Sequence, residues 1–229
     1  MSTLATFELL FDDRVRDTGA KLGSTERARA IAQALTRYAQ VRPVIAVQDY
    51  PGDGSTFDLA LPTGYVEGLS TILSIEYPLG ERVPALLETS AWSLYRTTTA
   101  LKLRLLSTTP ATGKTARVTF TKPHVVDVAG STVPVTDEAA VGDLAAAVGL
   151  RELAALYANT QDPTIAADVV NYRSKSEEYL RLAKELEGRY RAHLGLDKET
   201  EVRAGYAFTD VDQETTHGLE KLTHPNSRR

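Results

Sequence analysis

The spacing of apolar residues changes twice along this chain, and the change restricts the folds that it can adopt. Apolar side chains repeat with the period of an α-helix up to Pro43, alternate as in β-strands from Val44 to Thr121, and return to helical spacing at Thr136. We therefore expect an α+β fold. In it a helical bundle, made of N-terminal helices and a C-terminal helical hairpin, carries an inserted small antiparallel β-sheet or barrel and an extended C-terminal tail.

Two helices are predicted before the strands. The first is short and covers residues 4–11, followed by a charged and glycine-containing connection up to Gly23. The second has Ser24 as its expected N-cap and Glu26 in the first turn, where the helix dipole favours an acid. Pro43 ends this helix, because a proline disfavours helical geometry in the residue before it.

The middle of the chain predicts several short antiparallel strands separated by turns. The clearest alternation places Leu101, Leu103 and Leu105 on one face, with Lys102 and Arg104 between them. Strands at this spacing are typical of a small sheet or barrel. The other predicted strands cover residues 44–47, 57–61, 72–77, 92–96 and 117–121.

A helical hairpin is predicted after the strands. Its first helix has Thr136 as N-cap and runs over 137–157, and its second begins at Pro163 and ends near His193, with Gly195 as the C-terminal cap. The second helix carries a heptad seam that we expect to pack against the helix 137–157 and the N-terminal helix. The seam consists of Ile165, Val169, Tyr172, Ser176, Tyr179, Ala183, Leu186 and Tyr190.

These patterns divide the chain into four parts. The predicted domains are the N-terminal helices of the bundle (1–43), the inserted β domain (44–135), the C-terminal helical hairpin that completes the bundle (136–195) and an extended C-terminal arm (196–229).

Composition excludes several classes of function. The chain has 229 residues, a net charge of −4 and no cysteine, so disulfide frameworks, zinc–thiolate sites and thiol nucleophiles are excluded. The weak acidity provides no basic surface for nucleic acid. No apolar run approaches the roughly 20 residues that span a bilayer, and the N-terminus lacks the features of a signal peptide. We expect a soluble protein made in the cytoplasm, without a membrane partner.

No catalytic constellation emerges from the motifs. The segment Thr112 to Thr115 resembles the end of a phosphate-binding loop. However, Thr108 occupies the position where that loop needs a glycine, and a predicted strand follows where the loop needs a helix. We therefore expect a hairpin turn. Asp49, Asp53 and Asp58 do not have the spacing of a calcium loop and are expected to serve turns. The four histidines, which lack metal-ligand spacing, are His124, His193, His217 and His224. We expect no enzymatic activity, no cofactor and no metal.

Several short segments follow one another in a recognisable order. They are Asp13-Arg14-Val15-Arg16-Asp17, Ser24 to Pro43 (ending Arg37-Tyr38-Ala39-Gln40-Val41-Arg42-Pro43), Phe57 to Pro62, Ile75 to Gly80, Trp92 to Arg96, Val118 to Thr121, Tyr157-Ala158 and Ala166-Ala167-Asp168. This order, over roughly residues 12–195, resembles that of head–tail connector (adaptor or neck) proteins of tailed phages.

The resemblance implies a structural protein of the virion neck, located between capsid and tail. It implies a homo-oligomeric ring, usually of twelve copies, that docks on the portal protein, extends the channel for double-stranded DNA without binding it specifically, and provides a platform for the tail or its terminator or nozzle proteins. The arm carries a strand-like alternation of Val202, Ala204, Tyr206 and Phe208, which we expect to bind the portal.

Two other functions remain open from the sequence. One is a different neck or tail-completion protein of the same particle. The other is a carbohydrate-binding module, in which Trp92 and Tyr95 would form an aromatic platform with Tyr65 and Tyr77, although a sheet core with ordinary surface tyrosines is the favoured interpretation.

Overall fold

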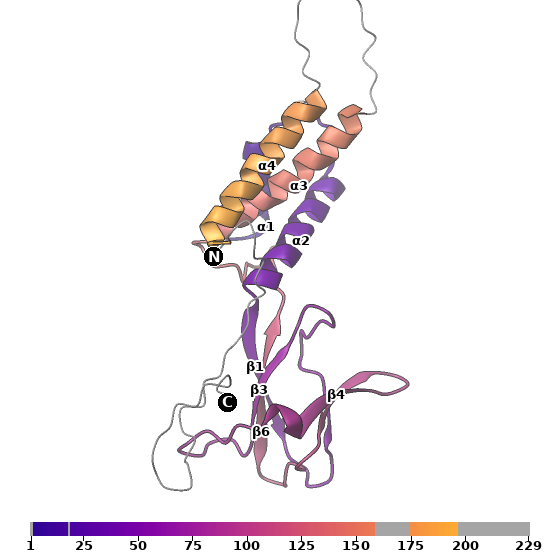
Figure 1. Cartoon of the computed structure of the whole chain (residues 1–229), viewed down its shortest axis with the longest axis vertical. Helices are drawn as coiled ribbons and strands as arrows, with labels where there is room; N and C mark the ends of the chain where they lie inside the picture. Colours follow the sequence, from indigo (N-terminus) through magenta and orange to yellow (C-terminus); the bar gives the residue numbers. More distant parts are fainter. Residues whose placement is uncertain (1, 18, 159–174, 197–229) are drawn as a thin grey trace, which may run out of the picture.

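The computed structural model describes residues 2–17, 19–158 and 175–196. Within these residues, four helices form one end of an elongated molecule and six strands form the other (Figure 1). The α+β class predicted from the sequence is confirmed. The elements are α1 (Leu4–Val15), α2 (Ser24–Val41), β1 (Val44–Pro51), β2 (Asp58–Ala60), β3 (Ile72–Glu76), a 3₁₀ turn (Thr89–Ala91), β4 (Trp92–Arg96), β5 (Leu101–Leu105), β6 (Thr115–Lys122), α3 (Glu138–Ala158) and α4 (Lys175–Leu194).

The helix α3 is the centre of the helical end and contacts the other three helices. Small residues let its neighbours approach closely. At Gly149, a Cβ atom would lie 2.5 Å from Cζ of Phe11, so the phenyl ring of α1 occupies the space that any side chain at this position would need. At Gly142, a Cβ atom would lie 3.1 Å from Cβ of Leu10. The glycines therefore set how closely α1 packs on α3.

The helix α1 is one turn longer than the sequence predicted. Phe7, Phe11 and Val15 follow each other at intervals of four and are all buried against the core. The charged run that starts at Asp12 was expected to be a connection, and that expectation is wrong. Asp12 and Asp13 continue the helix on its solvent side, and the half-buried Arg14 pairs with Asp143 of α3.

Both predicted N-caps are displaced by one residue. Gly23, and not Ser24, precedes the first helical residue of α2, and the Glu26 carboxylate accepts a hydrogen bond from the Gly23 backbone N–H at 3.0 Å. Thr136 is not the cap of α3. The helix starts at Glu138, and the carbonyl of Asp137 accepts the first helical hydrogen bond, from Val141 N–H at 2.9 Å.

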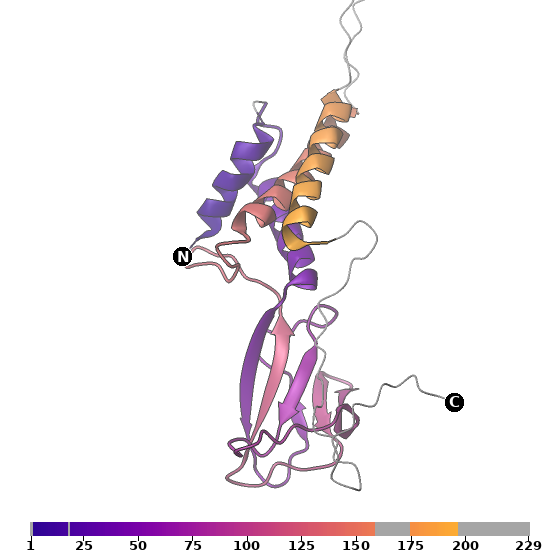
Figure 2. The same ribbon diagram turned by 60° about the vertical axis from the view of Figure 1, so that its left-hand side comes forward.

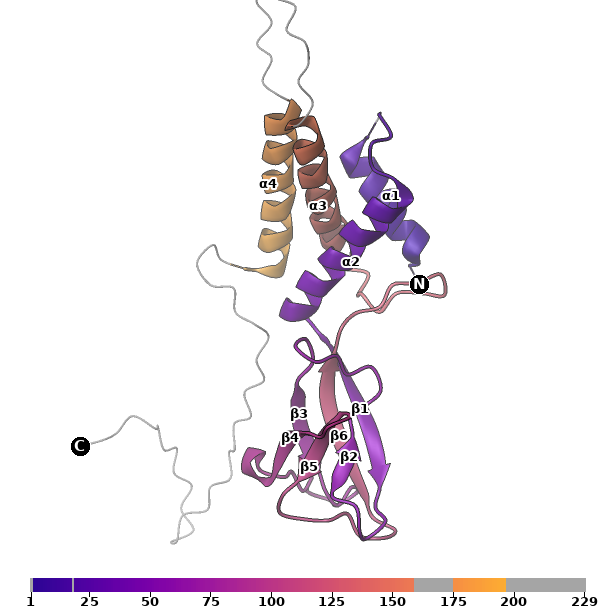
Figure 3. The same ribbon diagram turned by 90° about the vertical axis from the view of Figure 1, so that its right-hand side faces the viewer.

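The helix α4 lies along α3 (Figures 1 and 3), and the described part of the heptad seam contributes to this contact. Tyr179 is half-buried, and the seam residues after it are buried: Ala183, Leu186 and Tyr190. Gly195 follows the helix with φ +69°, as expected of a C-terminal glycine. The predicted helix start at Pro163 and the seam positions Ile165, Val169 and Tyr172 lie outside the described residues.

The strands form two three-stranded antiparallel sheets, in the orders β1–β6–β3 and β2–β5–β4. The two sheets share one hydrophobic core and pack face to face. The sequence predicted a small sheet or barrel, and the structure has two small sheets in its place. Buried residues of this core are Leu59, Ile72, Ile75, Leu103, Leu105, Val118 and Phe120.

The turn at Pro110 to Lys114 is present, but it is not a β-hairpin. It connects β5 to β6, which belong to different sheets, and Lys114 N–H donates to the carbonyl of Ala111 at 3.0 Å. The true partner of β6 is β1. All eight residues of β1 pair with β6, which explains why β1 extends to Pro51 and exceeds the predicted range 44–47.

Candidate functional site

The helical and β ends meet where α2 runs into β1 and where the chain returns from β6 to α3 (Figure 3). The C-terminal end of α4 lies close to this point, because His193 in its last turn contacts Asp137 just before α3. Three helix ends therefore converge on one junction, and the chain leaves α4 there towards the predicted C-terminal arm. None of the described helices is long and apolar enough to cross a membrane.

Asp137 is the centre of this junction and is only 2% exposed. Its carboxylate accepts hydrogen bonds from the Tyr38 hydroxyl and from Arg42 Nη1 at 2.9 Å, both from the end of α2. Its other oxygen lies 3.0 Å from Nε2 of His193, in the last turn of α4. One carboxylate at the start of α3 thus connects the ends of two other helices.

The electrostatics of the junction favour a charged Asp137. Burial alone would raise the pKa of its carboxyl, but the hydrogen bonds from Tyr38, His193 and Arg42 together outweigh burial and lower that pKa to about 2. Burial, together with the hydrogen bond to this carboxylate, raises the pKa of the Tyr38 hydroxyl above its ordinary value. The cluster is therefore a fixed ionic contact at neutral pH.

His124 extends the junction to the segment between β6 and α3. Its ring lies against Tyr38, with ring centroids 4.8 Å apart, and its Nε2 lies 2.8 Å from the carbonyl oxygen of Arg42. Nδ1 lies 3.1 Å from the Thr132 hydroxyl. These contacts give His124 a structural role, because they fix the loop between β6 and α3 to the end of α2.

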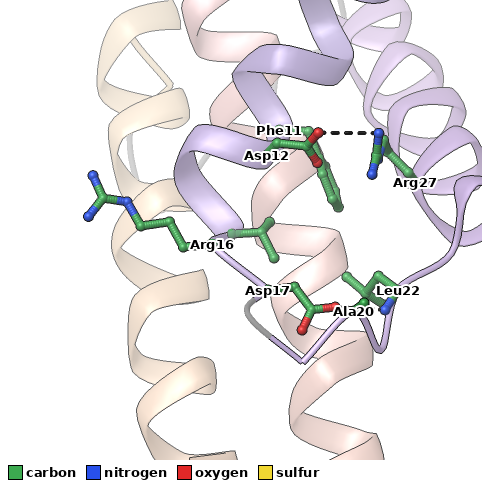
Figure 4. Close-up of a pocket in the computed structure, with 8 residues that line it drawn as sticks. Phe11, Asp12, Arg16, Asp17, Ala20, Leu22 and Arg27 are labelled. Carbon is green, nitrogen blue, oxygen red and sulfur yellow. Dashed lines mark hydrogen bonds and ion pairs between the residues drawn. The ribbon is translucent and has the colours of Figure 1, made fainter.

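A pocket of about 410 Å³ opens between the end of α1 and the start of α2 (Figure 4). Phe11, Val15 and Leu22 contribute its apolar lining. Its charged groups hold the surrounding loop: Arg27 pairs with Asp12 at 3.2 Å, and the Asp17 carboxylate accepts the Leu22 backbone N–H at 2.7 Å. These contacts hold the segment between α1 and α2 in place. No pattern in the local sequence predicted a cavity at this position.

The four aromatic residues considered for a sugar platform do not present one shared exposed surface. Trp92 and Tyr65 pack against the core between the sheets, and the Tyr77 hydroxyl accepts the Ala111 backbone N–H at 2.8 Å. The Tyr95 ring is exposed, but the Arg104 guanidinium lies 3.7 Å from its centroid. The favoured interpretation, a sheet core with surface tyrosines, agrees with this arrangement.

The three aspartates considered for calcium have other partners. Asp49 pairs with Arg117 at 2.7 Å. Asp58 likewise pairs with Arg104 at 2.6 Å. Asp53 accepts backbone N–H groups in the turn that follows β1. Across the described ranges, no group of acidic residues and histidines is arranged to hold a metal ion. The segment 112–115 leads into β6, so the helix that a phosphate loop requires is not there.

The predicted portal-binding residues Val202, Ala204, Tyr206 and Phe208 lie outside the described residues. The structure does locate the point from which this arm departs. Leu196, the last described residue, packs half-buried on the helical core, two positions after α4 ends beside the Asp137 cluster.

No family model matches the sequence, and no curated protein matches it.

Three solved structures that match come from gene transfer agent (GTA) particles. One, "Neck of empty GTA particle computed with C6 symmetry", matches with a TM-score of 0.31 and 16% identity over 76% of this chain and 87% of that chain. "Neck of native GTA particle computed with C12 symmetry" matches with a TM-score of 0.29 and 17% identity, over 78% and 91%. "Virion of native gene transfer agent (GTA) particle" matches with a TM-score of 0.29 and 18% identity, over 78% and 92%. TM-scores this low do not establish a common fold.

Proposed function

We propose that this chain is a structural neck protein of a tailed-phage-like particle, and specifically a head–tail adaptor. Copies of it form a ring of twelve that docks on the portal protein, extends the DNA channel and provides the platform for the tail. The observation that carries the proposal is the two-part architecture. The N- and C-terminal helices pack together, and the intervening strands project from them, in the order of segments that the adaptor resemblance requires (Figure 1).

The geometry suits assembly better than catalysis. A ring subunit needs two lateral faces for its sister copies and two axial faces for the portal and the tail. An elongated molecule with different bodies at its two ends offers such faces (Figures 1 and 2). Large exposed apolar residues occur along its length, in both bodies, including Leu9, Val83 and Val128, which are 65%, 79% and 85% exposed.

The proposed domains follow the predicted boundaries. Residues 1–43 and 136–195 make up the bundle, residues 44–135 the inserted β domain, and residues 196–229 the arm. Two separate hydrophobic clusters support this division, one formed mainly by the helices and one formed by the strands. The chain is made in the host cytoplasm and functions in the virion neck. Double-stranded DNA passes through the ring without specific binding, in keeping with a net charge of −4.

The arm supplies the contact with the portal in this proposal. Val202, Ala204, Tyr206 and Phe208 alternate with polar or small residues, so they would share one face if the segment pairs as a strand. The arm starts at the junction, where the Asp137 cluster fixes the end of α4. The first residue of the arm is therefore held at the junction, and its 34 residues (196–229) are long enough to extend to the portal in this proposal.

Deletion of residues 197–229 tests this role. The truncated chain is expected to fold, because Leu196 and all helical core residues are retained, and to lose binding to purified portal rings completely. Circular dichroism checks the fold, and co-sedimentation with negative-stain imaging checks docking. A matched variant with Tyr206→Ser and Phe208→Ser in the full chain should show the same loss. Docking that persists in both proteins would refute the role of the arm.

A further inference from the structure

The sheet β1–β6–β3 has two different edges. The outer edge of β3 is covered, because Tyr77 N–H donates to the Ala85 carbonyl at 2.8 Å and Leu87 N–H donates to the Ile75 carbonyl at 2.8 Å. The outer edge of β1 is open. Within the described part of the chain, β6 is the only segment whose backbone hydrogen-bonds to the backbone of β1.

The pairing with β6 shows which groups of β1 face this open edge. Gly52 N–H donates to the Lys114 carbonyl at 2.7 Å, one step beyond the last pair of the ladder. Since hydrogen-bonded and non-hydrogen-bonded pairs alternate in an antiparallel sheet, the backbone groups of Ile45, Val47 and Asp49 point outward. The side chains of Ile45 and Val47 are 48% and 58% exposed.

An edge of this kind is normally protected against pairing with another chain. The usual protections are charged side chains (lysine above all), proline, a bulge or a very short strand. β1 has eight residues, places its proline at the last position and pairs with β6 without a shift of register. Its one charged residue is Asp49, whose carboxylate is paired with Arg117 of β6. Its sequence and geometry therefore favour covering by another strand.

The second sheet has an open edge at β4. Leu106 N–H donates to the Ala91 carbonyl at 2.7 Å, and the alternation from there points the backbone groups of Trp92, Leu94 and Arg96 outward. The Leu94 side chain is 42% exposed. β1 and β4 lie on opposite sides of the strand-bearing end (Figures 1 and 3).

We propose that β1 of one copy pairs, edge to edge, with β4 of the next copy, and that this contact joins the β ends of the subunits. The inference rests on the proposed ring. Two different edges on opposite sides produce a head-to-tail contact, which gives a ring where the rotation between copies closes, as the proposed ring requires; a single self-complementary edge would produce a dimer. Ile45 and Val47 supply apolar surface on one side of the contact, and Leu94 supplies it on the other.

Site-directed cross-linking tests this pairing directly, because the natural chain contains no cysteine. Full-length Val47→Cys and Leu94→Cys proteins are treated with a short bismaleimide, separately and as an equimolar mixture. The mixture is expected to give cross-linked dimers, each single variant alone none, and the double variant a ladder of higher oligomers. Cross-linking of either single variant with itself, or a mixture that stays monomeric, would overturn the pairing.

Two further variants provide controls. Val83 is 79% exposed in a loop, so the Val83→Cys variant is accessible to the reagent but should not cross-link with Leu94→Cys. The double substitution Ile45→Thr and Val47→Thr keeps β-branched side chains but removes apolar surface from the β1 edge. Introduced into the Asp49→Cys protein, it should lower the yield of cross-linking to Leu94→Cys about tenfold. The thermal unfolding midpoint should not change.

Portal docking of the same preparations separates the two proposals. If the Val47→Cys and Leu94→Cys mixture docks on the portal as rings but does not cross-link, the edge pairing is rejected and the adaptor function is retained. Proteins that neither dock nor cross-link would reject both. Cross-linking without docking would support the pairing and reject the adaptor role.

Discussion

The Phe11→Ala variant is expected to lose about 3–5 kcal/mol of unfolding free energy. Phe11 is 2% exposed and lies where α1 crosses α3, against the backbone of Gly149. Removing the ring leaves a cavity next to a glycine, which has no side chain to fill it. Urea denaturation measures the loss. Leu9→Ala is the matched control on the same helix, because Leu9 is 65% exposed, and it should change stability by less than about 0.5 kcal/mol.

The Gly149→Ala variant tests the same contact from the other side. Alanine is the better helix former by about 1 kcal/mol, yet in the natural chain its methyl group would lie 2.5 Å from Cζ and 2.7 Å from Cε2 of Phe11. We expect destabilisation of about 1–3 kcal/mol in the natural chain and stabilisation in the Phe11→Ala background. An effect of the same sign in both backgrounds would contradict the close packing of Phe11 on Gly149.

The Asp137→Ala variant is expected to lose about 3 kcal/mol, because the fully buried Tyr38 hydroxyl and the Arg42 and His193 side chains lose a charged acceptor. Asp13→Ala, an exposed position on α1, is the matched control and should stay within about 0.5 kcal/mol of the natural chain. Equal losses in the two variants would show that the junction cluster does not stabilise the fold.

The same residue predicts a dependence on pH. The contacts of the folded chain lower the pKa of Asp137 from its ordinary value of 3.8 to about 2. The charged form is therefore favoured by folding, and its contribution of about 2 kcal/mol is present above pH 4 and is lost as the pH falls from about 4 to 2. Other acids titrate in this range, so the measured quantity is the difference between the natural chain and Asp137→Asn. That difference should shrink on acidification, and a constant difference would contradict it.

The fold class was predictable because it depends on local periodicity. The strict alternation from Leu101 to Leu105 identified β5 correctly, and helical spacing identified α2 to within a residue. The end of α1 was missed for a physical reason. A charged run such as that beginning at Asp12 is compatible with a connection or with the solvent side of a helix, and only the burial of Val15 on the core distinguishes them.

The junction was not predictable, because its members are far apart in the sequence. Tyr38, Arg42, Asp137 and His193 come from three helices, and their contact follows from how α2 and α4 pack on α3. The cap signal at Thr136 and Asp137 marked the start of α3 to within two residues, but it did not reveal that the Asp137 carboxylate faces other helices. The two-sheet arrangement was missed likewise, because β5 and β6 are adjacent in sequence but pair with different partners.

Electron cryo-microscopy of the assembled particle would show where this chain is located. We expect a ring of this chain between capsid and tail, with a four-helix body and a two-sheet body resolved in each copy. Density for this chain elsewhere in the particle, or a neck without it, would refute the proposed adaptor function.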